Sequence, residues 1–102
     1  MSTQNIQSIL LTTGLPVAYS HFQTSQTPPY IVWTGSGQNT FGADNTWYHR
    51  QNTYQIEYYF TKKNEANEAA IEDALLNAGM QYVKSADLFI EDQNVYLIYY
   101  DV

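Results

Sequence analysis

The residues of this sequence that are best suited to chemistry lie between Asn39 and Gln51, in the stretch NTFGADNTWYHRQ. His49 and Asp44 are an imidazole and a carboxylate, and general acid–base catalysis commonly uses such groups. The stretch is too polar for a strand and too aromatic for an idle loop, and the simpler interpretation of His49 is a loop histidine among solvated polar residues. We therefore expect a loop that contacts solvent or another molecule, with no catalytic residue and no enzymatic activity.

Metal and cofactor sites also lack their usual signatures. His21 and His49 have no further ligand at a helical or loop spacing, and the absence of cysteine excludes a thiolate zinc site. The segment EDQN, residues 91–94, lacks the glycine and the distal glutamate of a calcium loop, so it predicts a turn. The GSG at 35–37 lacks the lysine and the helix that follow in a phosphate loop. We expect neither a metal nor a cofactor.

Length and composition predict one folded domain over residues 1–102. The chain is 44% hydrophobic and only 14% charged, where about 25% charged residues is usual. A net charge of −6 with four lysine and arginine residues argues against direct binding to nucleic acid or to an anionic membrane. No apolar run approaches the roughly 20 residues that span a bilayer, and the N-terminus does not resemble a signal peptide. We therefore expect synthesis in a reducing cytoplasm.

Hydrophobic periodicity and turn residues predict an α+β fold with the order α-β-β-β-α-β-β. We expect a mostly antiparallel sheet of four or five strands, with two helices on one face. Ser2 or Thr3 is the expected cap of the first helix, and Asn64 that of the second. The acidic residues of the second helix favour its N-terminal half, and we expect a solvated face made of Glu65, Glu68, Glu72 and Asp73. The expected helices are 3–13 and 64–80, and the expected strands are 17–22, 30–34, 53–63, 81–91 and 95–102.

Both faces of the expected sheet are apolar, which is unusual for an antiparallel sheet with one solvated face. In the last strand, Val95, Leu97 and Tyr99 point one way, and Tyr96, Ile98 and Tyr100 point the other. Two short helices cover a single face. Either the surface tolerates half-exposed tyrosines, or the open face or its edge meets another subunit. We favour the second interpretation, in which residues 35–52 form a long mobile loop between the second and third strands that becomes ordered on binding.

Four segments resemble, as a set, a family of small structural proteins of tailed phages and prophages of Gram-positive bacteria. These segments are GLPVAYSHF, PPYIVW, NTFGADNTWYHRQNTYQIEYYFTKKN and EAAIEDALLNAG. Such proteins are labelled minor capsid, head–tail joining or tail-completion (tail terminator) proteins. The similarity runs from about Leu15 to the C-terminus, and its most specific parts are the leucine-proline entry into the first strand and FGAD followed by YH and YQIEYY.

The resemblance implies a ring, typically hexameric, that caps the tail tube and receives the head. The implied partners are further copies of the chain, the tail tube and head-connector proteins, and the implied location is the virion. The interface residues carried over from the motif are Phe41, Gly42, Asp44, Trp47, Tyr48, His49 and Arg50. Outward-facing tyrosines of the sheet, Tyr59, Tyr96 and Tyr100, extend this expected interface. Two alternatives remain: an aromatic-rich carbohydrate-binding module, and an acidic phage-encoded inhibitor of a host protein.

Overall fold

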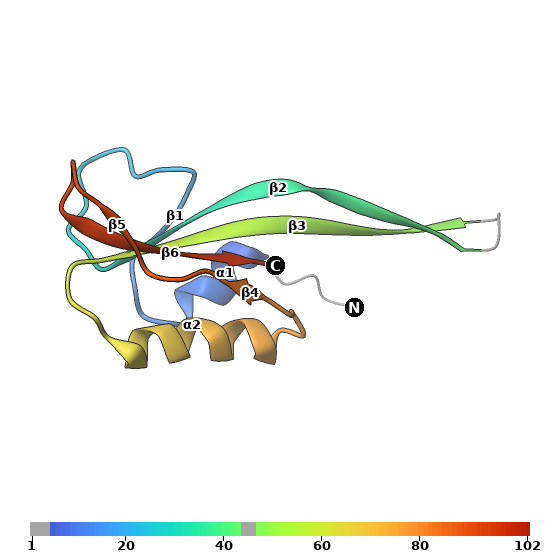
Figure 1. The fold of residues 1–102 in the computed structure, drawn as a ribbon. Helices are drawn as coiled ribbons and strands as arrows, with labels where there is room; N and C mark the ends of the chain where they lie inside the picture. Colours follow the sequence, from blue (N-terminus) through green and yellow to red (C-terminus); the bar gives the residue numbers. More distant parts are fainter. Residues whose placement is uncertain (1–4, 44–46) are drawn as a thin grey trace.

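The structure, a computed structural model, describes residues 5–43 and 47–102, and the side chains of these residues except those of 38–52. Two helices lie on one side of a six-stranded, mostly antiparallel sheet (Figure 1). The strand order is β1-β2-β3-β6-β4, with β5 also bonded to β6, and β1 runs parallel to β2. The elements are α1 (Ile6–Leu11), β1 (Val17–Tyr19), β2 (Tyr30–Ala43), β3 (Trp47–Phe60), α2 (Glu65–Asn77), β4 (Val83–Lys84), β5 (Leu88–Ile90) and β6 (Val95–Asp101).

The first helix is shorter than expected, and its cap is a different residue. Helix α1 begins at Ile6, and the Asn5 side chain accepts hydrogen bonds from the backbone N–H groups of Gln7 and Ser8 at 2.8 and 3.3 Å. This satisfies donors that have no partner inside the helix. Ser2 and Thr3, the expected caps, lie outside the described residues. Asn64 caps α2 as expected, because its Oδ1 accepts from the N–H of Asn67 at 3.1 Å.

The single strand expected over 81–91 is divided into β4 and β5, and both parts pair with β6. Between them, the backbone N–H of Ser85 donates to the carbonyl of Tyr99, and the Ser85 hydroxyl accepts from the N–H of Tyr99, both at 2.9 Å. A side chain thus replaces a backbone partner, and the regular ladder is interrupted. This interruption is why the sheet has six strands where four or five were expected.

The prediction of a long loop over 35–52 is wrong for the backbone that the structure describes. Strands β2 and β3 stay paired from Tyr30↔Tyr59 to Ala43↔Trp47, and residues 44–46 lie outside the described range. Alternation of apolar and polar residues marks a strand only where one of its faces packs on a core. This part of the hairpin runs beyond the sheet (Figure 1), so its sequence has no such alternation.

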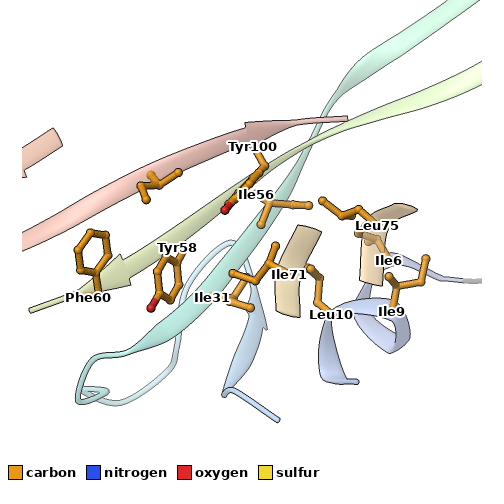
Figure 2. Close-up of a cluster of buried hydrophobic side chains, with 11 residues drawn as sticks. Ile6, Ile9, Leu10, Ile31, Ile56, Tyr58, Phe60, Ile71, Leu75 and Tyr100 are labelled. Carbon is orange, nitrogen blue, oxygen red and sulfur yellow. The ribbon is translucent and has the colours of Figure 1, made fainter. Parts of the chain in front are cut away.

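One face of the sheet packs against both helices (Figure 2). In β3, Ile56, Tyr58 and Phe60 point toward the helices. Helix α2 presents Ile71 and Leu75, both fully buried, and Ala74 and Ala78 pack at the margin of the cluster. The remaining members of this core are Ile6, Ile9, Leu10, Ile31, Ile98 and Tyr100.

The opposite face is also covered, and by the chain itself. Val32, Val95 and Leu97 point away from the helices, yet each is less than 8% exposed. The connection from β1 to β2, residues 20–29, lies on this side of the sheet (Figure 1). Its Phe22 ring packs edge-on against the ring of Tyr30, with the two ring centroids 5.3 Å apart. Apolar residues are thus buried on both faces of the sheet, as expected for the last strand, and the loop covers the second face near Tyr30, Val32 and Tyr59.

An ion-pair cluster joins α2 to the sheet edge, and it corrects the expected solvated face. The Glu68 side chain is only 4% exposed; its two oxygens lie 2.7 Å from Lys63 Nζ and 2.8 Å from Lys84 Nζ. Lys84 also pairs with Glu72 at 2.8 Å, and the Tyr100 hydroxyl donates to the same Glu72 oxygen at 2.9 Å. Burial alone would raise the pKa of the Glu68 carboxyl, but the two ammonium groups outweigh it and hold this pKa below its usual value.

Two adjacent leucines of α2 test the packing. Leu75 is fully buried, whereas Leu76 is 54% exposed. Leu75→Ala removes methyl groups from the closed core, so we expect the free energy of unfolding to fall by about 2–5 kcal/mol. The matched change Leu76→Ala should lower it by less than about 0.5 kcal/mol. Urea denaturation of both variants measures the difference, and equal losses would contradict the described orientation of α2.

Replacement of Glu68 tests the ion-pair cluster. Glu68→Gln should lower the free energy of unfolding by about 2 kcal/mol at neutral pH, less than a fully buried pair would lose. The expected loss of stability is smaller than for a fully buried pair because the side chains of Lys84 and Lys63 are 34% and 44% exposed to solvent. Because the folded-state pKa of Glu68 is lowered, its contribution is present above the usual carboxyl pKa and disappears as pH falls through the folded value.

The same variant should therefore lose part of the acid sensitivity of the wild type below about pH 5. Glu65→Gln, a change of an exposed glutamate in the first turn of α2, is the control and should change stability by less than about 0.5 kcal/mol. Thermal unfolding monitored by circular dichroism between acid and neutral pH supplies the measurement. An unchanged acid profile for Glu68→Gln would show that the cluster does not stabilise the fold.

Candidate functional site

The hairpin of β2 and β3 continues beyond the sheet as a two-stranded arm, here defined as residues 36–43 and 47–53 (Figure 1). Strand β1 pairs only with residues 31–33 of β2. On the other side, β6 pairs with β3 from Gln55 onward, and Val102 exchanges two backbone hydrogen bonds with Tyr54. Within the described chain, therefore, no third strand flanks the arm. The arm gives the molecule its elongated outline of 51 × 26 × 25 Å.

A bulge marks the root of the arm. The pairing register shifts between Gly35 and Gly37, so that Ser36 is an extra residue in β2. Gly37 has a φ of 142°, a backbone conformation that side chains with a Cβ rarely adopt. The Ser36 hydroxyl donates to the Thr53 hydroxyl across the two strands at 2.9 Å. Bulges bend a ribbon and increase its twist, so this one redirects the arm where it leaves the sheet.

The arm presents two rows of backbone N–H and C=O groups that no strand of the described chain satisfies. Such edges are templates for pairing with another strand. Hairpins of two strands are also marginally stable on their own in water. An added strand from a partner would supply the missing hydrogen bonds and surface, which is the physical basis of recognition by strand addition. These unpaired edges make the described backbone of the arm a candidate site for binding another strand.

Most of the expected interface residues belong to the arm. The register places Phe41 opposite His49, Gly42 opposite Tyr48, and Thr40 opposite Arg50. Trp47 is the first residue of β3 and pairs with Ala43. Asp44 lies outside the described residues, and so does any contact between Asp44 and His49. The backbone of the other expected motif residues therefore lies along the two paired strands of the arm.

The three tyrosines added from the sheet do not form one surface with each other. Tyr59 lies on the face opposite the helices, stacked on Tyr30 with ring centroids 4.9 Å apart. Tyr96 lies on the helix side, 39% exposed, between the rings of Phe60 and Phe89. Tyr100 has no exposed surface, because the core surrounds its ring and Glu72 accepts its hydroxyl hydrogen bond. Its assignment to an interface is wrong, and it is a core residue.

The sequence did contain a signal for the arm that the periodicity did not reveal. The turn-forming residues GADN stand between TF and TWY, two groups of β-branched and aromatic residues. Strand-forming residues on both sides of Gly, Asn and Asp are typical of a β-hairpin. The loop after β1, whose residues line a hollow discussed below, gave no comparable signal.

The described residues contain no group of three or more His, Asp or Glu side chains arranged to hold a metal ion. The segment 91–94 forms the expected turn, closed by a hydrogen bond of 3.2 Å from the N–H of Asn94 to the carbonyl of Glu91. None of the helices in the described part of the chain is both long and apolar enough to cross a membrane. A scan of protein-family models gives no match, and a search of curated proteins finds no significantly similar sequence.

Replacement of the arm tests whether the rest of the chain folds without it. Residues 38–52 are replaced by Asn-Gly, which suits a tight hairpin turn directly after the Gly37↔Thr53 pair. None of the described core residues lies in the removed segment. We expect cooperative unfolding with a free energy within about 1 kcal/mol of the wild type. Urea denaturation provides this value, and loss of the cooperative transition would show that the arm belongs to the fold.

Proposed function

We propose that the protein is a structural component of a phage virion that acts in tail completion and head–tail joining. In this proposal, identical subunits assemble into a ring that caps the tail tube and presents a surface to the head connector. The resemblance of residues 15–102 to tail-completion proteins supports the assignment, and so does the arrangement of body and arm. The observation that carries the proposal is the pair of unsatisfied strand edges on the arm.

The argument for assembly begins with the body of the protein. Its hydrophobic core is closed by α1, α2 and the sheet, and the second face is covered by residues 20–29. None of the residues of this described core lies in the arm. In the described part of the chain, the arm extends from the core and has two unpaired strand edges. Proteins normally avoid such edges because they pair with strands of other molecules. Pairing with a partner subunit would satisfy the backbone groups along these edges, and this is the function that we assign to the arm.

Strand pairing between neighbours leads naturally to a ring. If the arm of one subunit binds a different surface of the next, the contact is heterologous, and heterologous contacts close into rings when the rotation allows. Phe41 and Trp47 are carried on the arm, and full burial of such a side chain contributes about 2–3 kcal/mol. This apolar term, together with the new backbone hydrogen bonds, offsets the entropy lost when subunits associate.

The charge of the chain sets the conditions for assembly. Every subunit carries a net charge of −6, so neighbours repel each other until salt screens the repulsion. The four lysine and arginine residues give no basic surface on which DNA would bind. The ring is therefore expected to contact the tail tube and connector proteins, with no direct contact to nucleic acid.

The mass of the protein in solution tests this proposal. Light scattering after size exclusion should detect a species with the mass of a ring, and its fraction should increase with protein concentration and with ionic strength. Trp47→Ala should keep the melting temperature of the monomer and shift assembly to at least tenfold higher concentration, an effect of about 1.4 kcal/mol or more. Phe89→Ala, which changes an exposed aromatic residue of β5, is the matched control and should assemble like the wild type.

Two results would contradict the proposal. One is a monomer from micromolar to millimolar concentrations that also fails to bind purified tail tubes from the phage that encodes the protein. The other is equal assembly by the arm-deleted chain and the wild type, because the arm would then play no part in the contact. Loss of the fold in Trp47→Ala would place Trp47 in the core and remove it from the interface.

A further inference from the structure

A hollow of about 280 Å³ lies on the face of the sheet opposite the helices, and the proposed assembly does not use it. The loop after β1 and the turn between β5 and β6 form its rim, and β2 and β3 form its base. The hollow combines two kinds of surface, an aromatic base and an uncharged polar rim. Pockets that bind small molecules commonly join an apolar wall to a few polar groups in this way.

The base is apolar and firmly held. Tyr30 and Tyr59 stack with an interplanar angle of 24°, and Phe22 packs edge-on against Tyr30. Val32, 6% exposed, completes the base. The Tyr59 hydroxyl donates to Glu57 Oε1 at 2.6 Å, which fixes the orientation of the ring. A ligand therefore meets an ordered apolar surface that loses little side-chain entropy on binding.

The rim consists of hydroxyl, amide and imidazole groups. Ser20 and Thr24 contribute hydroxyls, Gln26 and Gln93 contribute amides, and His21 contributes a ring whose Nδ1 lies 3.2 Å from the Ser20 hydroxyl. All of these groups can both donate and accept hydrogen bonds. A wholly apolar ligand would bury them without partners, which is unfavourable. The rim thus selects a ligand that carries several hydroxyls or amides.

Charge narrows the ligand further. Among the described residues that line the hollow there is no lysine, arginine, aspartate or glutamate. An anion would find no cationic partner there and would be repelled by the net charge of −6. A cation would find no carboxylate in the lining. The ligand that fits both the rim and the base is neutral, rich in hydroxyls, and apolar on one face.

A strained turn holds the rim in place. Ser20 has a φ of 67°, which a residue other than glycine seldom adopts. The N–H of His21 donates to the carbonyl of Tyr19 at 2.7 Å, and the N–H of Ser20 donates to the carbonyl of Trp33 at 2.8 Å. The first bond closes the turn on β1 and the second anchors it to β2, and together they fix where His21 enters the rim. Strain of this kind concentrates at binding and catalytic sites, where position matters more than stability.

We propose that this hollow is a binding site for a neutral sugar, with the apolar face of one pyranose ring against Tyr30 and Tyr59 and its hydroxyls on the rim. The volume of about 280 Å³ lies just below the about 300–1,000 Å³ of pockets for drug-sized ligands, so the hollow suits a smaller ligand such as a single sugar ring. The site lies on the body and not on the arm, so the inference is independent of ring assembly.

Saturation-transfer-difference NMR on the whole chain tests the site, because it detects weak binding whatever the oligomeric state. The probes are glucose, galactose and N-acetylglucosamine, each tested alone, with inorganic phosphate as a competitor that should not displace them. We expect saturable binding of at least one sugar with a Kd on the order of 1 mM. Absence of saturable binding for all three sugars overturns the proposal, as does displacement by phosphate.

Matched variants locate the binding. His21→Ala and Gln93→Ala remove exposed groups from two different segments of the rim, the loop after β1 and the turn between β5 and β6, so the fold should be retained. Either change should weaken sugar binding about threefold to tenfold, the effect of one lost hydrogen bond. Gln23→Ala changes an exposed glutamine of the same loop that does not line the hollow, and it should bind like the wild type. Equal binding by all three variants would place the sugar elsewhere and overturn the assignment.

Discussion

Strand β3 is hydrogen-bonded along both edges and packed on both faces, and the other elements are arranged around this position. Its pairs with β6 run from Phe60 back to Gln55, and its pairs with β2 run from Tyr59 back through Gln55 into the arm. Ile56, Tyr58 and Phe60 face the helices, while Tyr59 faces the opposite side. A strand buried in this way needs two covers. The helices supply one, and residues 20–29 supply the other. The loop meets β2 and β3 around the hollow, whose lining includes Tyr30, Val32 and Tyr59.

The same strand then leaves the body, and the forces that hold it change. Inside the sheet, its register is fixed by side chains, because a slip of one residue would exchange its two faces. Beyond Tyr54, where Val102 makes the last bonds on one side, only β2 remains as a described partner. There the register depends on the backbone ladder and on the bulge between Gly35 and Gly37. The β2–β3 hairpin thus runs from the sheet into the arm, and its register is fixed by side-chain packing in the sheet and by backbone pairing in the arm.

The sequence predicted best those elements whose order comes from local packing. Helix α2 was predicted with Asn64 as its cap, and Asn64 does cap it. The strand predicted over 53–63 corresponds to the part of β3 that lies in the sheet. Wrong predictions arose where distant partners decide the outcome. Glu68 was expected in solvent, but Lys84, sixteen residues further along the chain, folds back to pair with it.

The arm and the sheet tyrosines of the candidate site were also predicted incompletely, and for the tyrosines this is because distant elements decide how they are exposed. The motif residues are adjacent in the sequence and were expected in a loop, because the sequence of the arm shows no alternation of apolar and polar residues. Tyr96 and Tyr100 share a face by their spacing, yet one is 39% exposed and the other is fully buried. The difference comes from β4 and α2, whose positions the spacing within β6 does not specify.

The low charge content of the chain suits the interface that we propose. In a ring of identical subunits, an acidic patch on one copy faces the same acidic protein on the next, so charge complementarity is difficult to build from a chain with only four basic residues. At least two of these, Lys63 and Lys84, are already committed to the ion pairs of α2. Backbone edges and aromatic side chains need no opposite charge. They are what this sequence has available for self-association, and the arm carries both.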